Sequence, residues 1–139
     1  MSNKTIISID AMGGSNSPDA IIEAVDRFFK SHDDVIFLLH GKKSVIMPII
    51  INYNFPENKY KLIDSESAIS DEDKPTTAWR NGKNSSMRKA VEAVKNGDAH
   101  AAVSSGNTGA LMLTSKMVLG TLEHVNRPAI TALFPSINN

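Results

Sequence analysis

Apolar residues recur along this chain in two different spacings. Short apolar or β-branched runs lie at residues 5–10, 35–39, 60–64, 99–103 and 128–134. Such runs are typical of buried strands. Between the first two runs, apolar residues recur at helical intervals from Ile21 to Phe29, which predicts a helix ending near Ser31. The same spacing predicts helices at about 42–52, from about 85 to a stop at Gly97, and at about 108–119.

Strands that alternate with helices predict a particular fold class. The order implies right-handed βαβ crossovers, and therefore an α/β fold with a mostly parallel sheet and helices on both faces. No repeat or linker divides the chain, so we expect residues 1–139 to form one α/β domain. Residues 65–77 are polar and are expected to form a surface loop with a short helical turn. The predicted strand 128–134 lacks a following helix to cover it, so a partner or a longer chain is expected there.

A loop of small polar residues follows the run 99–103. It contains Ser104, Ser105, Gly106, Asn107, Thr108 and Gly109. Glycines let a ligand approach the backbone, and the N–H groups at a helix N-terminus favour an anion. Four polar side chains exceed what a helix cap requires, so we interpret the stretch as a phosphate-binding loop. The alternative is a tight turn capped by Asn107 or Thr108.

Two further loops are candidates for the same site. Gly13 and Gly14 follow the first strand, before a helix for which Ser17 is the expected N-cap and Pro18 the first residue. Asp10 at the end of that strand is interpreted foremost as a cap, with metal binding or loop orientation as alternatives. Lys83, Ser85, Ser86 and Arg88 open another helix with hydroxyls and cations that suit phosphate. The alternative there is Ser85 as a plain N-cap beside solvated charges.

The carboxyl ends of parallel strands lie along one edge of a sheet, where α/β proteins bind ligands. This edge gathers the loops after residues 10, 41, 64 and 103, but the sequence does not give the strand order. His40 is the histidine expected on that edge, and we interpret it as structural rather than catalytic. Arg127 is expected at the opposite edge, before the fifth strand.

Composition excludes several classes of function. Fifteen basic residues balance fifteen acidic ones, so nucleic acid is not an expected partner. The absence of cysteine excludes disulfides and thiolate sites. No metal-ligand spacing, G-x-x-x-x-G-K-[ST] motif or G-x-G-x-x-G motif occurs. Without a signal-like N-terminus or an apolar run near the ~20 residues that span a bilayer, the expected location is the cytoplasm.

Several motifs in order carry a resemblance to a known family. They are Ile9–Gly14 with Pro18, Ser85–Met87, Val103–Ala110 and Arg127–Ala129. Together they are similar to the bacterial phosphate acyltransferase (PlsX-type) family of fatty acid and phospholipid synthesis. The resemblance covers almost the whole chain and implies a fold related to isocitrate and isopropylmalate dehydrogenases. It also implies formation of acyl-phosphate from acyl-[acyl carrier protein] and inorganic phosphate, by a cytosolic homodimer that associates peripherally with the membrane.

The sequence departs from that family in two ways. Ser15 stands where the family usually has aspartate, and family members continue beyond the point that matches Asn139. The resemblance therefore implies a truncated or split enzyme.

Phosphate can attack an activated thioester without a protein nucleophile, provided that donors hold the anion and the developing oxyanion. We expect neither a cofactor nor a metal, and assign catalytic roles to Asn107, Ser104 and Lys83. Phosphate binding is assigned to Gly106, Thr108, Gly109, Ser105, Ser85, Ser86, Arg88, Gly13, Gly14 and Asp10. The alternatives are an inactive remnant that at most binds phosphate, half of a split enzyme, or a related α/β enzyme that would need a carboxylate cluster.

Overall fold

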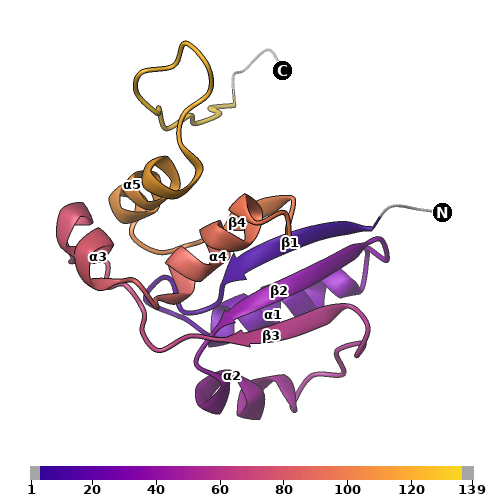
Figure 1. Cartoon of the computed structure of the whole chain (residues 1–139). Coiled ribbons are helices and arrows are strands. Elements are labelled where there is room, and N and C mark those ends of the chain that lie inside the picture. The colour runs from indigo at the N-terminus through magenta and orange to yellow at the C-terminus, as the bar shows by residue number, and fades with distance from the viewer. Residues whose placement is uncertain (1–3, 136–139) are drawn as a thin grey trace.

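The computed structural model describes residues 4–135, and its centre is a four-stranded parallel sheet (Figure 1). The strands are β1 (Thr5–Asp10), β2 (Val35–Gly41), β3 (Tyr60–Asp64) and β4 (Ala101–Val103). Their order across the sheet is β3-β2-β1-β4. The register pairs Ile9 with Leu39 on one side and with Val103 on the other. The loops after β1 and β4 are therefore neighbours.

Five helices surround this sheet in the described part of the chain. They are α1 (Asp19–Phe29), α2 (Lys43–Ile50), α3 (Pro75–Asn81), α4 (Ser86–Lys95) and α5 (Thr108–Leu119). Ile22 of α1 and Ile46 of α2 pack on one face of the sheet against Phe37 and Leu39. Ala93 of α4 packs on the other face against Leu38. The predicted α/β class, with a parallel sheet and helices on both faces, is confirmed.

Helices α3 and α5 form a further layer on the α4 side. Ala78 of α3, Met87 of α4 and Ala110 of α5 share a small buried cluster with Ile69. In Figure 1 these three helices lie together, away from α1 and α2.

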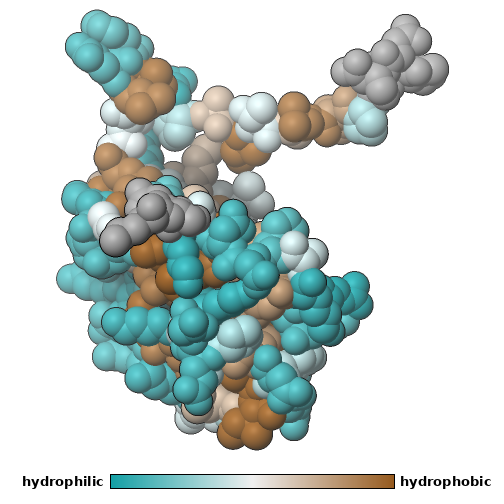
Figure 2. All heavy atoms as spheres, turned by 90° about the vertical axis from the view of Figure 1, so that its right-hand side faces the viewer, coloured by the Kyte–Doolittle hydropathy of each residue, from teal (hydrophilic) through white to brown (hydrophobic). Residues whose placement is uncertain are grey.

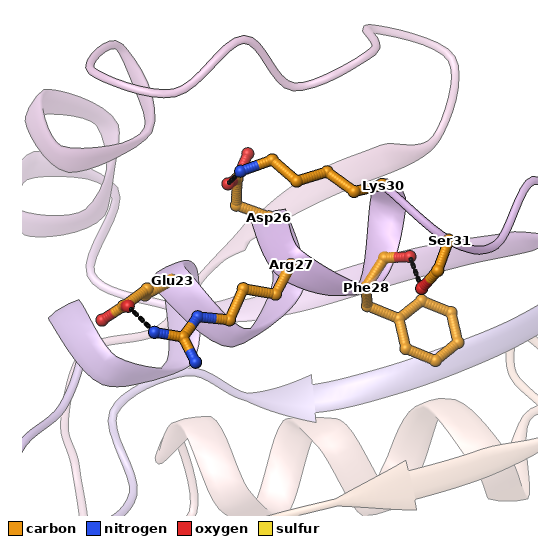
Figure 3. Close-up of polar contacts among 6 residues, drawn as sticks. All are labelled: Glu23, Asp26, Arg27, Phe28, Lys30 and Ser31. Carbon is orange, nitrogen blue, oxygen red and sulfur yellow. Dashed lines mark hydrogen bonds and ion pairs between the residues drawn. The ribbon is translucent and has the colours of Figure 1, made fainter.

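The outer face of α1 is a solvated surface (Figure 3). Arg27 pairs with Glu23 at 2.6 Å, and Lys30 pairs with Asp26 at 2.7 Å. Ion pairs four residues apart on a helix surface contribute only about 0.3–0.5 kcal/mol each. The buried residues of α1, Ile22 and Val25, come from its opposite face. The apolar spacing in the sequence therefore identified the buried face of α1 correctly.

The fifth strand predicted at 128–134 is wrong. No strand occurs within residues 121–135, where Leu133 and Phe134 are exposed. A strand needs a hydrogen-bonded neighbour, and this segment pairs with none of the four strands in the described part of the chain. The pattern of apolar residues alone does not provide that neighbour.

Smaller differences concern the ends of elements. The predicted N-cap at Ser17 is wrong, because α1 begins at Asp19 with Pro18 at the cap position, and the Ser17 hydroxyl donates instead to the Gly13 carbonyl. Helix α3 extends beyond the loop expected at 65–77, and β4 is shorter than 99–103. Gly97 follows the end of α4 and has a φ of 79°, which is typical of the glycine after a helix, so the predicted helix stop is confirmed.

Candidate functional site

The two glycine-containing loops meet at the carboxyl edge of β1 and β4. A Cβ on Gly106 would lie 3.1 Å from the Gly13 Cα, and one on Gly14 would lie 2.9 Å from the Ser105 carbonyl oxygen. Gly14 also has a φ of 93°, a backbone conformation that residues other than glycine rarely adopt. Both loops therefore need glycine in order to approach each other this closely.

Hydrogen bonds connect the same two loops. The Ser104 hydroxyl donates to Asp10 Oδ2 at 2.8 Å, and the Ser105 hydroxyl donates to the Gly13 carbonyl at 2.8 Å. Asp10 is buried, and its Oδ1 accepts from the Met12 amide at 3.3 Å. The carboxylate of Asp10 thus connects the two loops, which agrees with the loop-orienting alternative. The Ser104 oxygen also accepts from the Gly106 amide at 3.1 Å.

Asn107 caps α5 and also anchors a neighbouring loop. Its Oδ1 accepts from the Ala110 amide at 3.0 Å, so it is the N-cap of the helix. Its Nδ2 donates to three carbonyl oxygens of the segment 70–73, the shortest contact being 2.8 Å to Asp73. The Asn107 amide is thus committed to protein groups. The backbone amides of Thr108 and Gly109 come before the Ala110 amide that the cap satisfies, and the first amides of a helix have no partner within the helix. Thr108 is exposed and Gly109 is part-buried.

Replacing Asn107 by alanine is expected to lower the free energy of unfolding by about 1–2 kcal/mol, because the helix cap and the contacts to 70–73 are both lost. Asn107→Ser restores a capping oxygen but does not reach the segment 70–73. Urea unfolding should therefore place the serine variant between the wild type and the alanine variant. Full stability in Asn107→Ser would contradict a stabilising role for the contacts with 70–73.

Ser85 and Ser86 lie at the start of α4 and are fully buried. The Ser85 oxygen accepts from the Arg88 amide at 3.3 Å and donates to the Gly82 carbonyl at 2.7 Å, so Ser85 is a helix N-cap. The Ser86 hydroxyl has no hydrogen-bond partner within residues 4–135. Met87 brings the start of α4 next to the glycine loops, because a Cβ on Gly106 would lie 3.4 Å from the Met87 Cε.

The two cations predicted for the site, Lys83 and Arg88, line a hollow of about 460 Å³ between α3, α4 and α5. Its other lining residues are Thr76, Trp79, Arg80 and Leu113. The Arg88 guanidinium stacks over the Trp79 ring, 4.1 Å from its centroid, and Arg88 Nε donates to Glu92 at 2.8 Å. The ring and the carboxylate therefore hold Arg88 in one orientation.

A second hollow, of about 380 Å³, lies at the start of α5. Gly109, Lys116 and Arg127 line it, with Pro75, Met112, Leu113 and Pro128. The expectation that Arg127 lies at the edge opposite to the candidate site is therefore wrong. Without a fifth strand, the segment after α5 turns back and places Arg127 near the N-terminal half of that helix. The hollow combines two cations with apolar walls.

His40 lies at the carboxyl end of β2, where it is 2% exposed. Neither ring nitrogen has a hydrogen-bond partner in the described part of the chain. Burial, and after it the positive charge of Lys89, lowers the pKa of His40 to about 4, so the ring is neutral at neutral pH. Its ring makes no hydrogen bond to the glycine loops.

Two residues that the sequence alone did not indicate belong to this region. Trp79 and Arg80 come from α3, which the sequence predicted only as a short turn. The signal was the single tryptophan of the chain, next to arginine and four residues before Lys83. Within residues 4–135, no group of three or more histidine, aspartate or glutamate side chains is arranged to hold a metal ion. None of the helices there has the length and apolarity to cross a membrane.

Comparison with known proteins gives a consistent result. Residues 5–139 match the family described as "Fatty acid synthesis protein". The phosphate acyltransferase of Ruegeria sp. (strain TM1040) is 40% identical over 135 residues, which are 97% of this chain and 36% of that protein. The phosphate acyltransferase of Agrobacterium fabrum is 45% identical over 132 residues, covering 94% of this chain and 37% of that protein. The chain therefore spans less than two fifths of the length of these relatives.

Proposed function

Because the chain belongs to the fatty acid synthesis protein family, we propose that it forms part of a phosphate acyltransferase that converts acyl-[acyl carrier protein] and inorganic phosphate to acyl-phosphate. The names of the relatives support this reaction class. The chain corresponds to 36–37% of these proteins, so the activity belongs to an enzyme that also contains the remaining part.

The meeting of the two glycine loops beside the N-terminus of α5 is the observation that carries this proposal. A phosphate oxygen attacks the thioester carbonyl, the new C–O bond forms, and the C–S bond breaks to release the carrier thiol. Such a reaction needs an anion held in place and donors for the oxyanion. The backbone amides of Thr108 and Gly109 supply hydrogen-bond donors for phosphate at this edge, and the dipole of α5 favours its negative charge.

The remaining predicted residues take different roles in this proposal. Asp10, Ser104, Ser105, Gly13, Gly14 and Gly106 hold the two loops together, and Asn107 and Ser85 cap the helices that follow. Lys83 and Arg88, which line the hollow beside α5, supply positive charge for phosphate. Ser86 retains a hydroxyl without a protein partner.

The further attributes of the family enter the same proposal. The acyl donor is acyl carrier protein, the complete enzyme is a homodimer, and it acts in the cytoplasm with peripheral contact to the membrane. A second candidate is a chain that binds phosphate without catalysing transfer by itself. The small share of each relative that the chain covers favours this candidate for the chain alone.

The test is acyl-phosphate formation from acyl-[acyl carrier protein] and phosphate. It should be measured for the chain alone and for a chimera in which the chain replaces the matched region of the Agrobacterium fabrum enzyme. The chimera is expected to be active. Lys83→Ala should lower its rate about tenfold or more through the loss of a charge at phosphate. Lys95→Ala removes the same charge at the other end of α4 and should leave the rate unchanged.

The outcomes separate the two candidates. Activity of the chimera without activity of the chain alone supports a non-catalytic chain that needs the remaining part. An inactive chimera that is folded would contradict the acyltransferase proposal. Equal loss in the two lysine variants would contradict the role of Lys83.

A further inference from the structure

The hollow between α3, α4 and α5 is lined by three cations and by no acidic residue. Arg80 comes from α3, Lys83 from the turn before α4, and Arg88 from α4. Arg80 and Lys83 are exposed, and neither forms an ion pair with another residue in the described part of the chain. Three cations without a carboxylate in the lining favour an anion as the occupant.

The exposed cations of α1 show a different arrangement. Hydrophilic residues cover most of the body of the molecule on the side that Figure 2 shows, so exposed charge by itself does not mark a site. On α1, Arg27 and Lys30 each pair with a carboxylate four residues earlier, at 2.6 and 2.7 Å. Such pairing neutralises the cations on their own helix. Arg80 and Lys83 have no such partner among residues 4–135, so their charge is left for a ligand.

Arg88 presents its guanidinium group to the hollow in a fixed orientation. Its side chain is 20% exposed, its central carbon lies 4.1 Å from the centroid of the Trp79 ring, and its Nε donates to Glu92 at 2.8 Å. The two Nη groups donate no hydrogen bond to another residue within residues 4–135. Paired N–H groups on one guanidinium match two oxygens of a phosphate group. Phosphate is therefore the anionic group that suits this hollow.

The hollow is larger than inorganic phosphate. Its volume is about 460 Å³, whereas an anion of five heavy atoms takes on the order of 100 Å³, about three times the share of one water molecule in the liquid. Trp79 and Leu113 supply apolar walls. Leu113 also lines the apolar hollow at the start of α5, and the consecutive residues Pro75 and Thr76 line one hollow each. The two hollows are therefore neighbours, and an apolar substituent on the phosphate has room beside the cations.

From these observations we infer that Arg80, Lys83 and Arg88 together bind a phosphate group that carries an apolar organic substituent, with Trp79 and Leu113 beside the substituent. Arg80 is thereby added to the residues proposed for the site. The inference rests on the proposed function for the identity of the occupant, because acyl-phosphate is a phosphate group with an apolar acyl chain. Inorganic phosphate alone and the acidic surface of a partner protein are the other occupants that the test separates.

The test uses tryptophan fluorescence, because Trp79 is the single tryptophan of the chain and lines the hollow. Hexyl phosphate, a stable phosphate monoester with an apolar substituent, is titrated into the chain, and inorganic phosphate and hexanol are the comparison ligands. Hexyl phosphate is expected to bind at least about tenfold more tightly than inorganic phosphate, because its methylene groups are buried against the apolar walls. Hexanol should leave the fluorescence unchanged, since it offers nothing to the cations.

Arg80→Gln, at an exposed position, should weaken the binding of hexyl phosphate at least about tenfold, because a charged hydrogen-bond donor is lost. Arg27→Gln is the matched control, because it removes the same charge from the exposed face of α1 and should leave the affinity unchanged. Equal weakening in both variants overturns the inference, since the effect is then one of net charge.

The wild-type chain provides a further check that depends on no variant. Equal affinity for hexyl phosphate and inorganic phosphate overturns the inference in favour of inorganic phosphate. Absence of hexyl phosphate binding also overturns it, and leaves the acidic surface of a partner protein as the occupant. Acyl-phosphate formation by the chimera is measured separately. An inactive chimera contradicts the proposed function and leaves the binding result standing, whereas an active chimera does not rescue a chain that fails to bind hexyl phosphate.

Discussion

Replacing Gly13 by alanine is expected to lower acyl-phosphate formation in the chimeric enzyme at least about 100-fold, the loss typical of a misplaced oxyanion donor. The added Cβ would lie 2.5 Å from Asp10 Oδ2 and 2.9 Å from the Ser104 hydroxyl. The Ser104 hydroxyl donates a hydrogen bond to Asp10 Oδ2, and this bond connects the glycine loops. The two oxygens must separate to accept the methyl group, so the loop after β4 moves away from the loop after β1.

The same substitution should lower the free energy of unfolding by about 1–3 kcal/mol, the range for overpacking a close contact. Rates and urea unfolding should be measured on the same preparations. Gly97→Asn is the control, because a Cβ there meets nothing within 4 Å and asparagine tolerates its positive φ. A Gly13→Ala enzyme with the normal rate would contradict the proposal that the contact between the loops organises the phosphate site.

Replacing His40 by leucine is expected to change the dependence of stability on pH. The pKa of His40 is lowered to about 4 in the folded protein, against about 6.5 when unfolded. Between these values the unfolded chain binds more protons than the folded one, so the native state loses stability as the pH falls from about 6.5 toward 4. This shift corresponds to a loss of about 3 kcal/mol at the acid end of the window.

His40→Leu should remove this part of the pH dependence. It should also stabilise the protein near pH 7 by about 1 kcal/mol or more, because two buried ring nitrogens without partners are replaced by an apolar side chain. Urea unfolding at several pH values between 4 and 8 measures both effects. His32→Leu, at an exposed position, should retain the wild-type dependence. Parallel curves for wild type and His40→Leu would show that His40 does not carry the effect.

The sequence predicted the elements of the candidate site better than their contacts. The loops around Gly13 and Gly106 were recognised because glycine and small polar residues between a strand and a helix are a local signal. Their contact was not predictable, since it depends on β4 lying beside β1 rather than at the other edge. Strand order follows from how distant segments bury apolar surface, and a single sequence does not display it.

The roles of individual polar side chains show the same limit. Asn107 and Ser85 are residue types that suit both a helix cap and a ligand. The structure shows that both act as caps, and that the Asn107 amide also binds the segment 70–73. The grouping of Arg80, Lys83 and Arg88 around Trp79 depends on the presence of α3, which sequence periodicity did not reveal.

The sequence by itself determined four strands, four of the helices, the α/β class and the family resemblance, because residue spacing and motif order are local properties of the chain. Tertiary structure decided the strand order, the joining of the glycine loops through Asp10 and the burial of His40. It also decided that residues 128–134, which have the composition of a strand, pair with no strand in the described part of the chain. A strand exists only through hydrogen bonds to a neighbour, and those bonds depend on how the whole molecule packs.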